Sequence, residues 1–167
     1  MLLIRVTEDR LYWLQGDPVR PKIPLEMRVK DHMTAWASLD ALQKYADPPL
    51  AVVCTALSEG VPKTEKQLYK IPQNPDHVIY YTVWSNGQQK GAGRDIINSA
   101  LDSMKLMHPG FGHVTLSPKT KMARNFHLKN GAKELQVNDT SQNFEYDIEL
   151  EEWEKYLERA KSFFKIK

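Results

Sequence analysis

The stretch Gln88-Gln89-Lys90-Gly91-Ala92-Gly93 lies between an apolar run over residues 77–84 and a helical pattern over residues 94–106. A chain that turns through glycines from a strand into a helix directs several backbone N–H groups to one point, at the positive end of the helix dipole. Glycine also lets a phosphate approach the backbone without a side chain in the way. The stretch therefore predicts a site for a phosphate-bearing cofactor.

Spacing excludes three other kinds of glycine loop. A dinucleotide fingerprint needs a glycine at position 96, which is Ile96. A P-loop closes with Gly-Lys-Ser/Thr, whereas Gly93 is followed by Arg94 and Asp95. A kinase glycine loop lies inside a hairpin and does not precede a helix. A glycine turn that binds no ligand remains the alternative for so short a motif.

The stretch resembles the pyrophosphate loop of the GCN5-related N-acetyltransferases (GNATs), Gln/Arg-x-x-Gly-x-Gly/Ala, which opens the third helix after the fourth strand. Val83 stands where the family often has a small apolar residue, five positions before the glutamine. The resemblance covers residues 50–148, and residues 1–49 match only by the order of their elements. A GNAT implies an acetyl-coenzyme A donor and an amine acceptor.

A second family pattern, roughly Ala-x-x-Phe/Leu-Tyr-x-x-x-Gly-Phe, follows about thirty residues later. Ala123, Phe126 and Gly131 match it, while His127 replaces the tyrosine and Ala132 the final aromatic. Thr120 stands where the family often has asparagine. These departures leave open a GNAT-fold binding or regulatory protein without catalysis, or transfer of a longer acyl group.

The resemblance implies where coenzyme A would lie. In the family the fourth and fifth strands splay apart, and the pantetheine arm pairs with the exposed backbone of the fourth strand, here at Val83 and Trp84. The residues expected around the pyrophosphate are Gln88, Gln89, Lys90, Gly91, Ala92, Gly93 and Arg94. Thr120 and Arg124 are expected beside the cofactor, with a solvated basic face as the alternative for Arg124.

His127 occupies the position of the tyrosine that usually protonates the leaving thiolate in this family. An imidazole has an ordinary pKa of about 6.5, which leaves a charged fraction able to donate a proton near neutral pH. The alternative is a histidine that caps or packs the helix. Tyr80 or Tyr81 could then serve as the acid, or the thiolate could leave unaided.

His77 lies six residues before Val83, at a site where some family members carry a glutamate that acts as the base. The even spacing predicts that both side chains point to one face of the strand. The alternative is a strand-end histidine in solvent, and Glu26 and Glu59 are further candidates for the base. We expect Cys54, inside an apolar run, to belong to the core.

Composition places the chain among ordinary globular proteins. It has 167 residues, 41% hydrophobic and 26% charged, with a net charge of +2 that does not favour bulk nucleic-acid binding. A single cysteine fits a reducing compartment, and no apolar run is long enough to span a membrane, so we expect a cytoplasmic protein. No Cys/His cluster has metal-ligand spacing. The acceptor amine is not evident: a small molecule such as an aminoglycoside or a polyamine, a protein amine and an aminoacyl-tRNA all remain open. An aromatic stripe in residues 151–165 leaves a homodimer possible.

The hydrophobic pattern predicts a mixed α+β sheet with helices on its faces. The resemblance implies that the central sheet is mostly antiparallel and splayed between strands four and five, with helices on both faces. Strands are expected over residues 2–6, 11–15, 50–57, 67–71, 77–85 and 114–116, with a closing hairpin over residues 132–137 and 143–148. Helices are expected over residues 31–46, 94–107 and 121–130. An amphipathic helix over residues 151–165 is expected to follow as an appendage of a single domain, residues 1–167.

Overall fold

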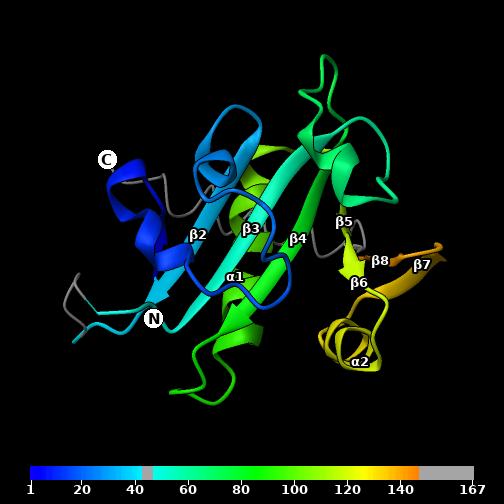
Figure 1. The fold of residues 1–167 in the computed structure, drawn as a ribbon. Coiled ribbons are helices and arrows are strands. Elements are labelled where there is room, and N and C mark those ends of the chain that lie inside the picture. The colour runs from blue at the N-terminus through cyan, green and yellow to red at the C-terminus, as the bar shows by residue number, and fades with distance from the viewer. Residues whose placement is uncertain (43–46, 147–167) are drawn as a thin grey trace, which may run out of the picture.

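The computed structural model describes residues 1–42 and 47–146, which form one twisted sheet with helices and irregular chain on its two faces (Figure 1). The strands are β1 (Leu2–Arg5), β2 (Met33–Leu39), β3 (Ala51–Ser58), β4 (His77–Ser85), β5 (Gly112–Thr115), β6 (Ser117–Pro118), β7 (Lys133–Val137) and β8 (Ser141–Glu145). The helices are α1 (Ala92–Met107), α2 (Lys121–Lys129) and three 3-10 helices, η1 (Glu8–Leu14), η2 (Glu26–Val29) and η3 (Glu65–Tyr69).

The strand order is β1-β2-β3-β4-β5-β8-β6, and β7 pairs with β8 at the side of this path. Only the β4–β5 pair is parallel among the described pairs. The α+β fold with a mostly antiparallel sheet is therefore confirmed. So are the predicted strands that became β1, β3, β4 and β5, the helices α1 and α2, and the β7–β8 hairpin up to residue 146. The helix expected over residues 151–165 lies outside the described residues, and the single-domain assignment stays a prediction.

The helix predicted over residues 31–46 is wrong, because residues 33–39 form the strand β2. Met33, Ala35 and Ala37 alternate with Thr34 and Trp36 at a period of two, and over so short a segment the apolar positions also fit a helix. Pairing with two neighbouring strands stabilises this segment as a strand, since β2 pairs with β1 on one side and with β3 on the other. Pairing across long sequence separations overrides a local pattern that fits either structure.

Two shorter predictions, the strands over residues 11–15 and 67–71, are also wrong. The first segment belongs to η1 and the second overlaps η3. The η3 turn begins with a capping box, in which the side chains of Thr64 and Gln67 bond each other's backbone N–H groups. This start signal outweighs the apolar pattern that suggested a strand.

The sheet separates two apolar clusters. On one face α1 buries Ile96, Ile97 and Ala100 against β3, β4 and β8. The opposite face is covered by η1, η2 and the irregular chain around them, whose Trp13, Leu14 and Ile23 are almost fully buried there. α-Helices were expected on both faces, but 3-10 turns and irregular chain provide this second cover. In the described part of the chain, no helix is both long and apolar enough to cross a membrane.

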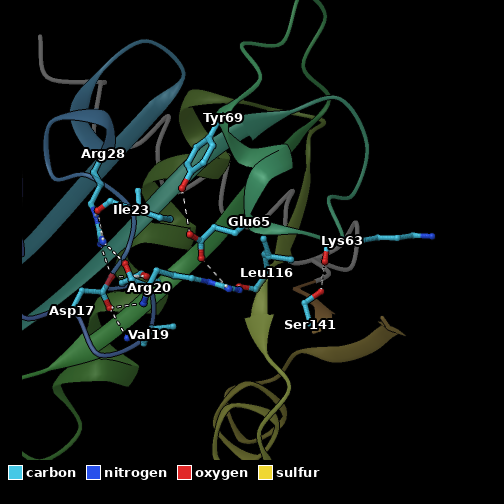
Figure 2. Close-up of polar contacts among 11 residues, drawn as sticks. Asp17, Val19, Arg20, Ile23, Arg28, Lys63, Glu65, Tyr69, Leu116 and Ser141 are labelled. Carbon is cyan, nitrogen blue, oxygen red and sulfur yellow. Dashed lines mark hydrogen bonds and ion pairs between the residues drawn. The ribbon is translucent and has the colours of Figure 1, made fainter. Parts of the chain in front are cut away.

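A buried ion pair fixes the chain that covers this second face (Figure 2). The Arg28 guanidinium binds the Asp17 carboxylate, and each side chain is 1% exposed. Asp17 also accepts bonds from the N–H groups of Val19 and Arg20, at 2.7 and 3.2 Å. The Thr82 hydroxyl of β4 donates to Asp17 at 2.9 Å. The pair therefore ties the covering chain to the middle of β4.

We expect Asp17→Asn to lower the free energy of unfolding by about 3–5 kcal/mol, because it leaves the Arg28 charge buried without a counter-ion. Urea titration at neutral pH measures the change. The matched control is Glu8→Gln, which removes the exposed partner of Lys30, and should change stability by less than about 1 kcal/mol. Equal small effects for both variants would contradict a structural role for the buried pair.

Candidate functional site

The sheet opens where β4 and β5 stop pairing. The two strands run side by side only from His77 to Tyr80, opposite Gly112 to Thr115. The last bond between them runs from Leu116 N–H to Tyr80 O at 3.0 Å. Among the described residues, no strand pairs with the rest of β4 on that side. We call the space beside residues 81–85 of β4 the β4–β5 gap.

A β-bulge marks the closed end of this gap. On the β3 side, Thr55 pairs with Tyr80 and Cys54 with Thr82, so Tyr81 is an extra residue. Because of the bulge, the side chains of Tyr81 and Thr82 both point to the face opposite α1. Tyr81 packs in the apolar cluster on that face, and Thr82 bonds Asp17 there.

The bulge corrects the prediction that His77 and Val83 share a face. His77 lies on the face of Ile79, opposite α1, whereas Val83 packs in the cluster on the α1 side. An extra residue shifts the alternation by one, so an even spacing across it no longer means a common face.

Val83 presents its backbone to the gap. Asn86 N–H bonds Leu50 O, toward β3, and backbone groups of alternate residues in a strand point to opposite neighbours. Trp84 and Thr82 therefore turn their backbone groups to β3, while those of Val83 face the gap. Of the two residues predicted to pair with pantetheine, the geometry favours Val83. The Trp84 indole packs on the face opposite α1.

The predicted pyrophosphate loop leads from the open end of the gap into α1. Gly91 caps the helix in a left-handed conformation (φ 84°), which glycine adopts without strain, and no side chain caps this end. The first helical bond runs from Asp95 N–H to Gly91 O at 2.9 Å. Ala92 N–H donates to Gln89 O at 3.3 Å, whereas the N–H groups of Gly93 and Arg94 have no such bond within the described part of the chain and are available to an anion.

Arg94, in the first turn of α1, places its guanidinium beside this loop. Its Nη2 lies 3.5 Å from where a Cβ on Gly91 would stand, so the guanidinium folds back over the glycine. It also contacts Asp95 at 3.3 Å and is 63% exposed. Lys90, Gln88 and Gln89 are exposed around the same turn.

Helix α2 lies next to the glycine loop. Phe126 lies 3.6 Å from where a Cβ on Gly93 would stand, which places α2 beside the start of α1. Thr120 caps α2 by accepting from Ala123 N–H at 3.2 Å, so its hydroxyl already has a structural partner. Arg124 forms an ion pair with Glu134 of β7, which offsets the charge that the sequence suggested for coenzyme A.

His127, on the same helix α2, is buried, with 6% of its surface exposed. Its Nδ1 lies 2.7 Å from the Tyr146 hydroxyl, and its ring stacks on Phe144 at 5.4 Å. Burial lowers the pKa of His127 to about 4, so the imidazole is neutral at neutral pH. The expectation of a charged fraction there is wrong, because it took the pKa of an exposed imidazole. Sequence reasoning missed Tyr146, for which no motif gave a signal.

The other predicted catalytic residues lie on β4, at the closed end of the gap or before it. His77 Nδ1 is 2.7 Å from Asp76 Oδ1, and the ring covers Gly112, where a Cβ would come within 2.5 Å of it. Tyr81 is 1% exposed, and burial raises the pKa of its hydroxyl well above the ordinary value. Tyr80 bonds His113 at 2.9 Å. Their roles in catalysis stay predictions.

The chain is similar to known proteins in its three-dimensional structure. No family model and no curated protein matches the sequence. A malonyl-CoA decarboxylase from Rhodopseudomonas palustris is similar to 95% of the chain (TM-score 0.68, 17% identity). A putative GNAT-family acetyltransferase from Desulfovibrio desulfuricans is similar to 87% of it and is itself 98% covered (TM-score 0.62, 12% identity). The chain has the GNAT fold.

A third solved structure is similar to this chain, and the malonyl-CoA decarboxylases are longer than this chain. AtaTR bound with AcCoA also has this GNAT fold, with a TM-score of 0.57, 15% identity, and coverage of 86% of this chain and 92% of that one. The chain spans 38–63% of the length of the malonyl-CoA decarboxylases that it matches. At these identities the comparisons establish the GNAT fold and leave the reaction to the chemistry of the site.

The two glycines of the loop should respond to alanine in opposite directions. Gly91→Ala should lower the free energy of unfolding by about 1–2 kcal/mol, because alanine is strained in the left-handed conformation. Gly93→Ala should raise it by about 0.5–1 kcal/mol, since alanine favours a helix and its Cβ meets Phe126 at an ordinary distance. Thermal or urea unfolding without ligand measures both, and a shared sign would contradict this loop geometry.

Burial of His127 should make stability fall on acidification. The unfolded chain binds a proton with a pKa near 6.5, while the folded chain resists it down to about 4. Stability is therefore lost as the pH falls from about 6.5 to 4, by about 3 kcal/mol for this one group. Urea titrations at pH 7 and 4.5 should show a smaller loss for His127→Phe than for wild type. An unchanged loss would mean that His127 is already accessible to protons.

Proposed function

We propose that this chain binds acetyl-coenzyme A in the β4–β5 gap and transfers the acetyl group to a primary amine in a ternary complex. The observation that carries the proposal is that the unpaired backbone of Val83 leads to the uncapped start of α1 at Gly91. A linear ligand with an amide-rich arm and a pyrophosphate end matches both parts. The GNAT fold supports the same assignment.

The chain's own residues suggest the order of binding along the gap. The N–H groups at Gly93 and Arg94 would hold the pyrophosphate, with the Arg94 guanidinium folded over it. Val83 would pair with the arm as a neighbouring strand does. The thioester would then reach the bulge at Tyr81. Backbone N–H groups near a bulge can stabilise the oxyanion that develops on the thioester oxygen.

The transfer itself needs one bond made and one broken. The amine nitrogen attacks the thioester carbon, the C–S bond breaks, and the nitrogen loses a proton while the thiolate gains one. A free thiol has a pKa near ~8.5, so the leaving group needs only modest help. We assign that help to a hydrogen bond from the neutral His127 ring, which Tyr146 holds in place. His77, oriented by Asp76 on the face of Tyr81 and Thr82, is our candidate for the base.

Decarboxylation of a malonyl thioester is the second candidate. It is favoured by two of the malonyl-CoA decarboxylases, whose TM-scores of 0.68 exceed those of the GNAT-fold structures quoted above. In that reaction the bond between the carboxylate and the α-carbon breaks, carbon dioxide leaves, and the resulting enolate takes a proton at carbon. The same gap would bind the thioester, and the same N–H groups would stabilise the enolate oxygen.

We expect Gly91→Asp to abolish binding of acetyl-coenzyme A, because a carboxylate would face the pyrophosphate. Isothermal titration calorimetry measures the affinity. Gly91→Asn is the matched control, because it brings a side chain of the same size and the same backbone strain without the negative charge, and it should retain measurable binding. Unchanged affinity in Gly91→Asp would refute the loop as the binding site.

Turnover assays then separate the reactions. Free thiol released from acetyl-coenzyme A in the presence of an amine indicates transfer, and carbon dioxide released from malonyl-coenzyme A indicates decarboxylation. Binding with neither product would indicate a non-catalytic GNAT-fold protein.

A further inference from the structure

A group of charged side chains lies over the closed end of the β4–β5 gap, on the face opposite α1 (Figure 2). Arg20 Nη2 donates to Leu116 O at 2.9 Å. Leu116 N–H in turn makes the last bond to Tyr80 before the gap opens. The guanidinium therefore lies where β4 and β5 separate, at the end of the gap away from Gly91.

Arg20 differs from its neighbour Arg28 in how its donors are used. Arg28 is 1% exposed, and its Nε, Nη1 and Nη2 all donate to Asp17 or to the carbonyls of Ile23 and Arg20. Arg20 is 12% exposed, and its Nη1 reaches Glu65 at 3.4 Å, near the limit for a bond. Its Nε is shielded from solvent and has no partner among the described residues. Arg28 is thus saturated, whereas Arg20 keeps unused donors.

Glu65 presents the opposite charge beside it. The carboxylate is 29% exposed and receives a bond from the Tyr69 hydroxyl at 3.3 Å. Both residues belong to η3, whose start is fixed by the capping box of Thr64 and Gln67. A partly exposed anion and an incompletely bonded cation therefore lie side by side.

We propose that Arg20 and Glu65 form the acceptor site, and that the acceptor is a small amine with a carboxylate close to its amino group, as in an α-amino acid. This inference rests on the proposed acetyl transfer. With the pyrophosphate at Gly91, the thioester end of the donor lies at the closed end of the gap, where these side chains are. Glu65 receives the ammonium group before it loses its proton, and the second N–H groups of the Arg20 Nη1 and Nη2 atoms, which Glu65 and Leu116 do not use, receive the carboxylate.

The same pair selects against other amines. A polyamine or an aminoglycoside carries only positive groups, so it would meet the Arg20 charge and leave the Arg20 donors unpaired. Unfavourable contacts of this kind are an effective source of specificity. Arg28 does not compete for the substrate carboxylate, since its donors are already occupied.

Initial rates of thiol release at saturating acetyl-coenzyme A test the proposal. The probes are pairs that differ in the carboxylate alone: L-lysine and cadaverine, L-serine and ethanolamine, L-phenylalanine and phenethylamine. We expect at least one amino acid to exceed its partner at least tenfold in kcat/KM. Arg20→Gln should raise KM for that amino acid at least tenfold and remove the preference. Arg5→Gln, an exposed arginine of β1, is the matched control and should match wild type.

A binding measurement keeps the two proposals distinguishable. Calorimetry should give the same affinity for acetyl-coenzyme A, within about twofold, in wild type and Arg20→Gln. The preferred amino acid should raise the Tm of the wild-type complex with coenzyme A and leave that of Arg20→Gln unchanged. If wild type binds acetyl-coenzyme A but prefers the amines without a carboxylate, or uses no amino acid, the acceptor assignment is overturned. If wild type does not bind acetyl-coenzyme A, the proposed function itself fails.

Discussion

The parallel pairing of β4 with β5 ends at the bond from Leu116 N–H to Tyr80 O, and the candidate site is built on the backbone left unpaired beyond it. Unpaired backbone inside a sheet is normally costly unless another group bonds it. In this fold the free groups of Val83 face a gap that continues to the uncapped start of α1. A ligand that supplies amide groups and a pyrophosphate would satisfy both, so the interrupted pairing and the glycine loop belong to one site.

The bulge at Tyr81 and the ion pair of Asp17 with Arg28 support this arrangement from the other face. The extra residue turns both Tyr81 and Thr82 away from α1, and Thr82 then bonds the buried carboxylate of Asp17. The segment that carries Asp17 also carries Arg20, whose guanidinium donates to the carbonyl of Leu116, the residue after β5. The chain between η1 and η2 therefore contacts β4 and the residue that follows β5, where the two strands separate. It supplies Arg20 of the pair that we assign to the acceptor, and η3 supplies Glu65.

The elements around the loop could be predicted because their signals are local. The glycines, the apolar run before them and the helical period after them sufficed for β4 and α1. The strand β2 could not be distinguished from a helix, since its short apolar pattern fits both and its pairing partners lie elsewhere in the chain. His77 and Val83 were assigned to one face because a bulge has no composition signal in this strand. The low pKa of His127 depends on Phe144 and Tyr146, which lie seventeen or more residues along the chain.

Cys54 adjoins the bulge through its pairing with Thr82, and it is the chain's one cysteine. It is fully buried, and burial raises the pKa of its thiol to about 11. A thiol in this state reacts with an alkylating or disulfide reagent only when the centre of the sheet opens. Colorimetric detection of released coenzyme A should thus have little background from the native protein. The rate of Cys54 labelling, followed with and without ligand, would report how firmly a bound donor closes the sheet around it.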